Sequence, residues 1–127
     1  MLNVLVVDDS TFQRLALVAM IETLGYKVVA QAENGEEGYE KYKEFKPDMI
    51  LTDIRMPNMD GVKMSGIIRK ENENIPIVVS SAFSDSEYLS ESISVGVNNY
   101  LLKPIILEKL FTILKVTAEN IDKKRSL

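Results

Sequence analysis

Polar side chains that could do chemistry follow four of the short apolar runs in this sequence. They are Asp8 and Asp9 after residues 4–7, Asp53 after residues 49–52, Ser80 and Ser81 after residues 75–79, and Lys103 after residues 100–102. Carboxylates bind hard cations or act as nucleophiles, a lysine places a point charge on a phosphoryl oxygen, and a hydroxyl donates a hydrogen bond to it. Any one of these residues would alone be read as a helix cap or a turn, but their recurrence favours one shared site.

The chain contains no histidine and no cysteine. Their absence excludes Ser-His-Asp and Cys-His nucleophiles, imidazole and thiolate metal sites, iron–sulfur clusters and disulfides. Three carboxylates held close together repel one another unless a cation compensates their negative charge. The sequence therefore favours an oxygen-ligated divalent ion, and Mg²⁺, which takes a few carboxylates together with phosphate oxygens, suits this set best.

Charge and length bound the remaining classes. The 127 residues carry 15 basic and 19 acidic side chains, a net charge of −4 that argues against direct nucleic-acid binding. We find no apolar stretch long enough to span a membrane and no basic leader, and expect a cytoplasmic protein. A single domain over residues 1–122 is expected, with residues 123–127 as a polar tail or the start of a linker.

The elements that must position these side chains alternate in type along the chain. Strands are predicted at residues 4–7, 27–32, 49–52, 75–79 and 100–102, and helices follow each of them, the last over about 105–120. Capping boxes are predicted at Ser10 with Gln13 and at Ser84 with Glu87, and Asn34 is predicted to cap the second helix. The predicted inward faces are Phe12, Leu15, Ala16, Ala19 and Leu24; Gly38, Tyr42 and Phe45; and Ile106, Leu110, Phe111 and Leu114.

Strands that are apolar throughout are covered on both faces. Alternation with helices then predicts an α/β fold, a doubly wound five-stranded parallel sheet of (βα)5 type. In such sheets, ligands bind outside the carboxyl ends of the strands. The polar residues that follow the apolar runs lie at these ends: Asp8, Asp9, Asp53, Ser80, Ser81 and Lys103.

The order of these motifs resembles that of response-regulator receiver domains. The residues that carry the resemblance are Asp8-Asp9, Asp53 with Met56-Pro57 and Asp60-Gly61, Ser81-Ala82, Tyr100, and Lys103-Pro104. The resemblance covers about residues 2–120 and implies a flavodoxin-like sheet with strand order 2-1-3-4-5. It also implies a signalling phosphoacceptor that catalyses only its own phosphorylation and dephosphorylation, with a sensor histidine kinase or histidine phosphotransfer protein as its partner. The output domain or target is not implied.

The resemblance also assigns roles to individual residues. Asp53 would be the phosphorylated nucleophile, Asp9 a direct Mg²⁺ ligand and Asp8 a ligand through water, with the backbone carbonyl of Arg55 completing the set. Lys103 would pair with the phosphoryl group, and its bond to Pro104 would be cis. The donor histidine belongs to the partner, which accounts for its absence here.

Three further expectations concern the surroundings of this site. Ser80 and Ser81 point to opposite faces of their strand. The family pattern, in which Ala82 follows the hydroxyl and Lys103 lies 22 positions on, implies Ser81 as the switch hydroxyl. Tyr100 matches the aromatic switch position that responds to it. Arg55 and Phe83 are expected to screen the phosphoryl group from water and slow its hydrolysis.

Other functions remain open at this stage. A Mg²⁺-dependent phosphatase of the haloacid dehalogenase type would need a second aspartate at position 55, where Arg55 stands. A flavodoxin-like electron carrier would need a hydroxyl-rich loop in place of Asp8-Asp9, and no P-loop is present. A receiver that serves only as a docking module, without phosphorylation, is the third alternative.

Overall fold

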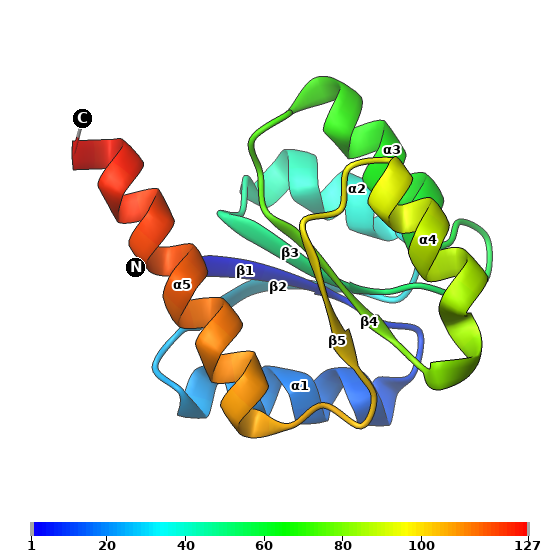
Figure 1. Ribbon diagram of the computed structural model, residues 1–127, viewed down its shortest axis with the longest axis horizontal. Coiled ribbons are helices and arrows are strands. Elements are labelled where there is room, and N and C mark those ends of the chain that lie inside the picture. The colour runs from blue at the N-terminus through cyan, green and yellow to red at the C-terminus, as the bar shows by residue number, and fades with distance from the viewer. Residues whose placement is uncertain (1, 127) are drawn as a thin grey trace.

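Five parallel strands form one sheet in the order β2-β1-β3-β4-β5, which confirms the predicted doubly wound fold (Figure 1). The computed structural model describes residues 2–126, apart from the side chains of Phe83 and Ser126. The strands are β1 Asn3–Val7, β2 Lys27–Ala32, β3 Met49–Asp53, β4 Ile77–Ser81 and β5 Asn99–Leu102.

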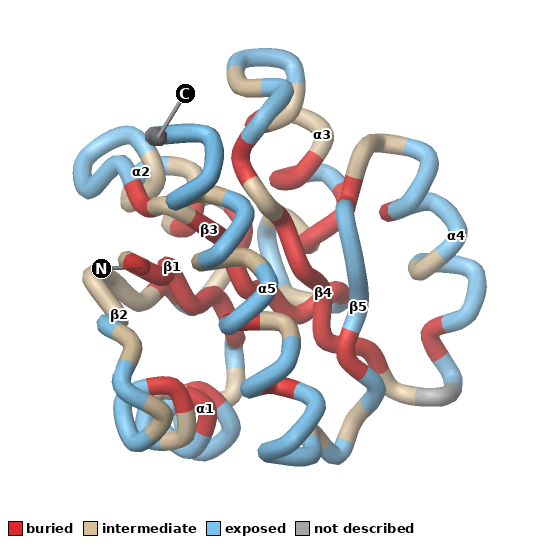
Figure 2. The backbone as a smooth tube through the Cα atoms, turned by 60° about the vertical axis from the view of Figure 1, so that its left-hand side comes forward, coloured by how far each residue is buried: buried red, intermediate tan, exposed pale blue. Residues whose placement is uncertain are grey.

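Helices cover both faces of this sheet. They are α1 Thr11–Thr23, α2 Gly35–Phe45, α3 Gly61–Glu71, α4 Ser86–Ser94 and α5 Leu107–Ser126, with the short 3₁₀ helix η1 Phe83–Asp85 before α4. One apolar cluster joins the sheet to α2, α3 and α4, and a second joins it to α1 and α5. Figure 2 shows the result: β1, β3 and β4 are buried between helices whose outer sides are exposed, whereas the edge strands β2 and β5 are partly exposed. Within residues 2–126, no helix is long and apolar enough to cross a membrane.

Side-chain caps begin three of the helices. Ser10 Oγ accepts a hydrogen bond from Gln13 N at 3.2 Å, and Asn34 Oδ1 accepts one from Glu37 N at 2.9 Å, so both predicted N-caps are confirmed. The reciprocal half of the predicted box is not formed, because Ser10 N donates to Asp8 Oδ1 and Gln13 Oε1 accepts from Lys103 Nζ. Asp60 caps α3 in the same way. These caps set where the loops that leave the carboxyl edge of the sheet turn into helices.

The predicted cap of α4 is wrong. Neither Ser84 nor Glu87 caps this helix, which begins at Ser86 after the η1 turn. The cause is Asp85, whose Oδ2 accepts a hydrogen bond from Ala82 N at 2.8 Å. A carboxylate that turns back onto the preceding strand end closes a tight turn there, and the α-helix therefore starts later than the sequence pattern indicates.

The predicted inward face of α1 is also wrong. Its buried residues are Arg14, Leu17 and Ile21, whereas Phe12 is 83% and Leu15 is 52% exposed. Ala16 and Ala19 are exposed as well, and Leu24 is partly buried against the second cluster. Residues 14, 17 and 21 share one helix face. That face can pack inward with Arg14 in it because the guanidinium donates hydrogen bonds to Gln31 Oε1 of β2 and to the backbone carbonyl of Asp8.

Two predictions for α2 and α5 need correction. Gly38, Leu110 and Leu114 are buried and Tyr42 is partly buried, as predicted, but Phe45, Ile106 and Phe111 are 43%, 53% and 40% exposed. Helix α5 also continues to Ser126 instead of ending near Asn120. An ion pair of 2.8 Å between Arg125 Nη2 and Asp48 Oδ1 ties its last turns to the start of β3.

Candidate functional site

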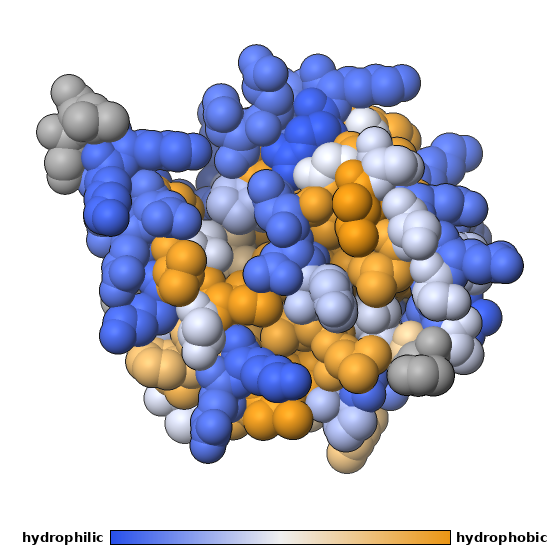
Figure 3. All heavy atoms as spheres, viewed as in Figure 1, coloured by the Kyte–Doolittle hydropathy of each residue, from blue (hydrophilic) through white to orange (hydrophobic). Residues whose placement is uncertain are grey.

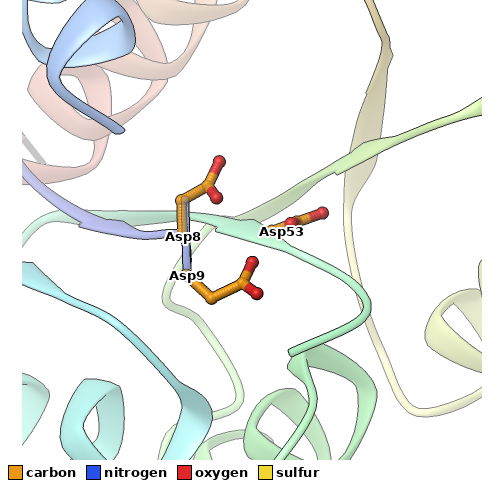
Figure 4. A group of neighbouring side chains, drawn as sticks. All are labelled: Asp8, Asp9 and Asp53. Carbon is orange, nitrogen blue, oxygen red and sulfur yellow. The ribbon is translucent and has the colours of Figure 1, made fainter. Parts of the chain in front are cut away.

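Three carboxylates converge at the carboxyl edge of the sheet. Asp8 and Asp9 follow β1 and Asp53 ends β3, and Figure 4 shows the three side chains gathered in one place. One oxygen from each lies within 4.8 Å of the others. The convergence follows from the pairing of β1 with β3 in parallel register, with Val7 opposite Thr52, which brings both strand ends to the same edge.

Asp53, the acceptor candidate, is buried. It is 7% exposed, and its Oδ1 accepts hydrogen bonds from Ile54 N at 2.8 Å and from Lys103 Nζ at 3.0 Å. Burial raises the pKa of this carboxyl above its ordinary value of 3.8, and the contact with Lys103 acts in the opposite direction. The ammonium group therefore compensates part of the cost of holding a charged carboxylate here.

Lys103 reaches Asp53 from the end of β5. Its Nζ also donates to Gln13 Oε1 of α1 at 3.2 Å, and its backbone N donates to Ser81 O at 2.8 Å. The bond between Lys103 and Pro104 is cis, as the sequence resemblance implied. Lys103 thus joins the end of β5 to β3 and α1 through its side chain and to β4 through its backbone.

Asp8 is held from two sides. Its Oδ1 accepts from Ser10 N at 2.9 Å, and its backbone carbonyl accepts from Arg14 Nη1 at 2.9 Å. Burial is the main cause that raises the pKa of the Asp8 carboxyl, and the charge of Asp53 raises it further. Arg14 was not predicted to support the site. The signal that could have revealed it is its spacing from Leu17 and Ile21, which places all three on one face of α1.

Gly61 lets the acceptor loop close against the start of α3. Gly61 N donates to Ile54 O at 2.7 Å, and a Cβ at position 61 would lie 2.1 Å from Asp53 O. No side chain fits at that distance. The Asp60-Gly61 pair of the sequence is therefore explained by a cap followed by a close approach of two backbones.

Ser81 and Ser80 lie on opposite faces of β4. Ile77 and Val79 belong to the cluster on the α4 side, and Val78 belongs to the one on the α5 side, so Ser81 faces the α4 side. Ser81 Oγ is buried and has no hydrogen-bond partner among residues 2–126. A buried hydroxyl without a partner is costly unless a ligand or a movement satisfies it. This agrees with the choice of Ser81, whose role as the switch hydroxyl stays a prediction.

Tyr100 shares that face of the sheet. It pairs in register with Val79, two residues before Ser81, and its side chain is 48% exposed. The ring is therefore partly turned to solvent at the outer edge of the sheet. The structure places the two proposed switch residues on one face and leaves their coupled movement as a prediction.

The side chain of Arg55 lies against α4. Its Nε is 2.8 Å from Asp85 Oδ1, and its guanidinium lies 5.6 Å from the ring centre of Tyr88. The Arg55 side chain was expected to screen the acceptor. In this structure its guanidinium lies against Asp85 and Tyr88 instead. The corresponding expectation for Phe83 falls on a side chain outside those described, and the role of the Arg55 carbonyl as a metal ligand stays a prediction.

The donor set fits a hard divalent cation. Asp8, Asp9 and Asp53 offer oxygen atoms only, and burial raises the pKa of two of them, as expected where negative charges are gathered out of water. Asp9 is exposed, which leaves one side of the cluster open to solvent and to a reacting group. The arrangement can hold an ion between three carboxylates while Lys103 keeps a second positive charge at the acceptor.

The chain is similar to known proteins over most of its length. Residues 4–115 match the model of the "Response regulator receiver domain" family. The chain is 42% identical over 102 residues to the chemotaxis protein CheY of Thermotoga maritima, covering 80% of this chain and 85% of that protein. It resembles the crystal structure of the REC domain of AraT, a response regulator from Geobacillus stearothermophilus, with a TM-score of 0.88, 28% identity and 98% of both chains covered.

Another similar structure is that of a complex with ligands. The chain resembles CheY in the crystal structure of the CheX-CheY-BeF₃-Mg²⁺ complex from Borrelia burgdorferi, with a TM-score of 0.83 and 29% identity. The likeness covers 91% of this chain and 88% of that one.

Proposed function

The chain belongs to the response regulator receiver domains of two-component systems, and from this premise we propose that it is a cytoplasmic phosphoacceptor. Asp53 takes a phosphoryl group from a histidine on a sensor kinase or a histidine phosphotransfer protein. The observation that carries the proposal is the enclosed Asp53 carboxylate, in contact with Lys103 and beside Asp8 and Asp9.

The reaction is a phosphoryl transfer between two proteins. An oxygen of the Asp53 carboxylate forms a bond to phosphorus while the bond from phosphorus to the donor histidine nitrogen breaks, and that nitrogen keeps the electron pair. Lys103 neutralises charge that spreads over the phosphoryl oxygens, and the backbone N–H of Ile54 holds the acceptor carboxylate in place. Catalysis of this kind consists of positioning and electrostatic stabilisation.

Mg²⁺ is the cofactor that we assign to this site. Asp9 and Asp53 would hold it directly, Asp8 through water, and the carbonyl of Arg55 would complete the protein ligands. When bound, the ion offsets the mutual repulsion of the carboxylates and draws phosphoryl oxygens toward the acceptor. The presence of Mg²⁺ and BeF₃ in the name of the Borrelia burgdorferi complex supports this assignment.

An apolar patch beside the site supports docking of a protein donor. Phe12 and Leu15 of α1 are 83% and 52% exposed, and Ile106 and Leu107, which follow Lys103-Pro104, are 53% and 44% exposed. The hydrogen bond from Lys103 to Gln13 shows that α1 and the end of β5 meet here. We assign this patch to the donor protein, whose histidine must approach Asp53 from solvent.

The response to phosphorylation is proposed to run through Ser81 and Tyr100 to the surface of α4, β5 and α5. Apolar side chains gather over that surface in Figure 3, and Ile93, Leu102 and Phe111 are 58%, 46% and 40% exposed. The phosphoryl group would supply the missing partner of the Ser81 hydroxyl, which biases the two-state element that Tyr100 reads.

Asp53→Asn tests the proposal. The wild-type chain incubated with acetyl phosphate and Mg²⁺ should gain the mass of one phosphoryl group in intact-mass measurements, and the variant should gain none. Asp60→Asn is the matched control, because it makes the same chemical change in a helix cap that asparagine also serves. Full labelling of the Asp53→Asn variant would refute the assignment.

The same measurement separates the alternatives. A docking receiver that works without phosphorylation would show no labelling of the wild type and no response to a Mg²⁺ titration. A phosphatase would release phosphate repeatedly from a substrate, but it needs an acid two residues after the nucleophile. Arg55 stands there and contacts α4 instead.

A further inference from the structure

One buried carboxylate joins the two loops that flank the acceptor. Asp85 is 4% exposed, and its Oδ1 lies 2.8 Å from Arg55 Nε, in the loop after β3. Its Oδ2 accepts a hydrogen bond from Ala82 N, in the turn after β4. Asp85 thus contacts a residue two positions after Asp53 and a residue directly after Ser81.

The contact with Arg55 is an ion pair that can open. Asp85 Oδ1 has no well-aligned hydrogen bond among the described residues, although Arg55 Nε is close to it. The Arg55 side chain is 55% exposed and rests over the ring of Tyr88. A long side chain held at the surface by one such pair can leave without disturbing the core.

We propose that Asp85 is a positioning residue that keeps the Arg55 guanidinium on α4 until a phosphoryl group on Asp53 competes for it. This inference rests on the proposed function. Lys103 is the cation that contacts Asp53 in this structure. A phosphoryl group brings more negative charge than the carboxylate of Asp85 and offers a guanidinium several acceptor oxygens.

Release of Arg55 would also act on α4. Asp85 would then be a buried carboxylate without its cation, held by the Ala82 N–H alone, and such a group is destabilising. The turn that it closes lies between Ser81 and the first residue of α4. Competition for Arg55 would therefore couple the state of Asp53 to the start of α4, in addition to the Ser81 hydroxyl.

The test measures the affinity of the whole chain for beryllofluoride, with Mg²⁺ present, by calorimetry in four variants. Asp85→Asn keeps an acceptor for Ala82 N but releases Arg55, so binding should tighten about two- to fivefold, the range of a partly exposed ion pair. Arg55→Gln should weaken binding, and adding Asp85→Asn to it should then change nothing. Glu87→Gln is the control, because it removes an exposed charge from the first turn of α4 without touching Arg55.

The outcomes separate the two proposals. A wild-type chain that binds no beryllofluoride contradicts the proposed function itself. If the wild type binds but Asp85→Asn behaves like Glu87→Gln, or tightens binding equally in the Arg55→Gln background, Asp85 does not act through Arg55. Should Asp85→Asn unfold, an Arg55→Gln variant with unchanged affinity would by itself overturn the inference.

Discussion

The two ends of the central sheet treat buried polar groups in opposite ways. At the carboxyl end, Asp8, Asp9 and Asp53 crowd together and the Ser81 hydroxyl has no partner among residues 2–126. At the amino end, buried and half-buried polar groups are paired. The first end holds the proposed phosphoacceptor site, and the second end holds the layers together.

Pairing at the amino end centres on Arg69 of α3. Its guanidinium donates to Gly96 O, Asn72 O and Asn98 Oδ1 at 3.0, 3.1 and 2.8 Å, and Asn98 Oδ1 also accepts from Ile77 N at 2.8 Å. Burial lowers the pKa of Arg69, yet each nitrogen of the guanidinium has an acceptor. This network ties α3 to the starts of β4 and β5.

Asp48 plays the same role at the start of β3. Its Oδ2 accepts from Asn3 N, and its Oδ1 pairs with Arg125 of α5, both at 2.8 Å. The comparison teaches that stability and function are divided between the ends of one sheet. The crowded carboxylates at the carboxyl end have one cationic partner, Lys103, and a bound cation would compensate the charge that remains.

The largest effect is expected for Gly61→Ala, which attacks the carboxyl end sterically. A Cβ at 2.1 Å from Asp53 O forces two backbones apart, so we expect a loss of about 3 kcal/mol in the free energy of unfolding and strongly slowed phosphorylation. Gly66→Ala is the control. Gly66 lies in the same helix as Gly61, and its added Cβ would lie at an ordinary contact distance of 3.7 Å from Val95, which follows α4, so this variant should gain about 0.5 kcal/mol. Denaturant unfolding measures both, and equal losses would contradict the steric argument.

A smaller effect is expected for Asn98→Ala at the amino end. The change leaves Ile77 N and one nitrogen of Arg69 without their acceptor, which should cost about 2 kcal/mol of unfolding free energy. Mg²⁺ affinity should be unchanged, because the network lies at the far end of the sheet. A weakened Mg²⁺ affinity in a titration would show that the two ends are not independent.

The smallest effect, and one of opposite sign, is expected for Asp8→Asn. Removing one of three crowded charges should raise the metal-free unfolding free energy by about 1 kcal/mol and weaken Mg²⁺ binding. Thermal unfolding with and without Mg²⁺ measures both quantities. A metal-free variant less stable than the wild type would mean that the Asp8 carboxylate is favourable as it stands.

The pH dependence of the metal-free protein is an independent check on the predicted stabilisation by Asp8→Asn. The pKa values of Asp8 and Asp53 are raised above 3.8 in the folded chain, so the folded state binds more protons than the unfolded state between the two values. The free energy of unfolding therefore falls as the pH rises through that range. Above it, both carboxyls are ionised and their full destabilising effect is present. Asp8→Asn should reduce this fall.

Much of the fold could be predicted because it depends on local pattern. Apolar runs indicated all five strands, and the caps at Ser10 and Asn34 placed two helix starts correctly. The buried face of α1 could not be predicted, since the burial of Arg14 depends on Gln31 within β2 and on Glu33 directly after it, residues that only the packing of α1 on the sheet brings close. The start of α4 was missed for a local reason: Asp85 accepts a hydrogen bond from Ala82 N, three residues before it, and closes the η1 turn ahead of α4.

The sequence by itself determined which side chains meet, because a parallel sheet brings the carboxyl ends of its strands to one edge, so that Asp8, Asp9, Asp53 and Lys103 had to converge. Only the tertiary structure decided how they meet. Burial raises the pKa of Asp8 and Asp53, Lys103 contacts one oxygen of the acceptor, and Asp85 draws Arg55 onto α4. These features depend on distance and exposure to water, which arise from packing between segments that lie far apart in the chain.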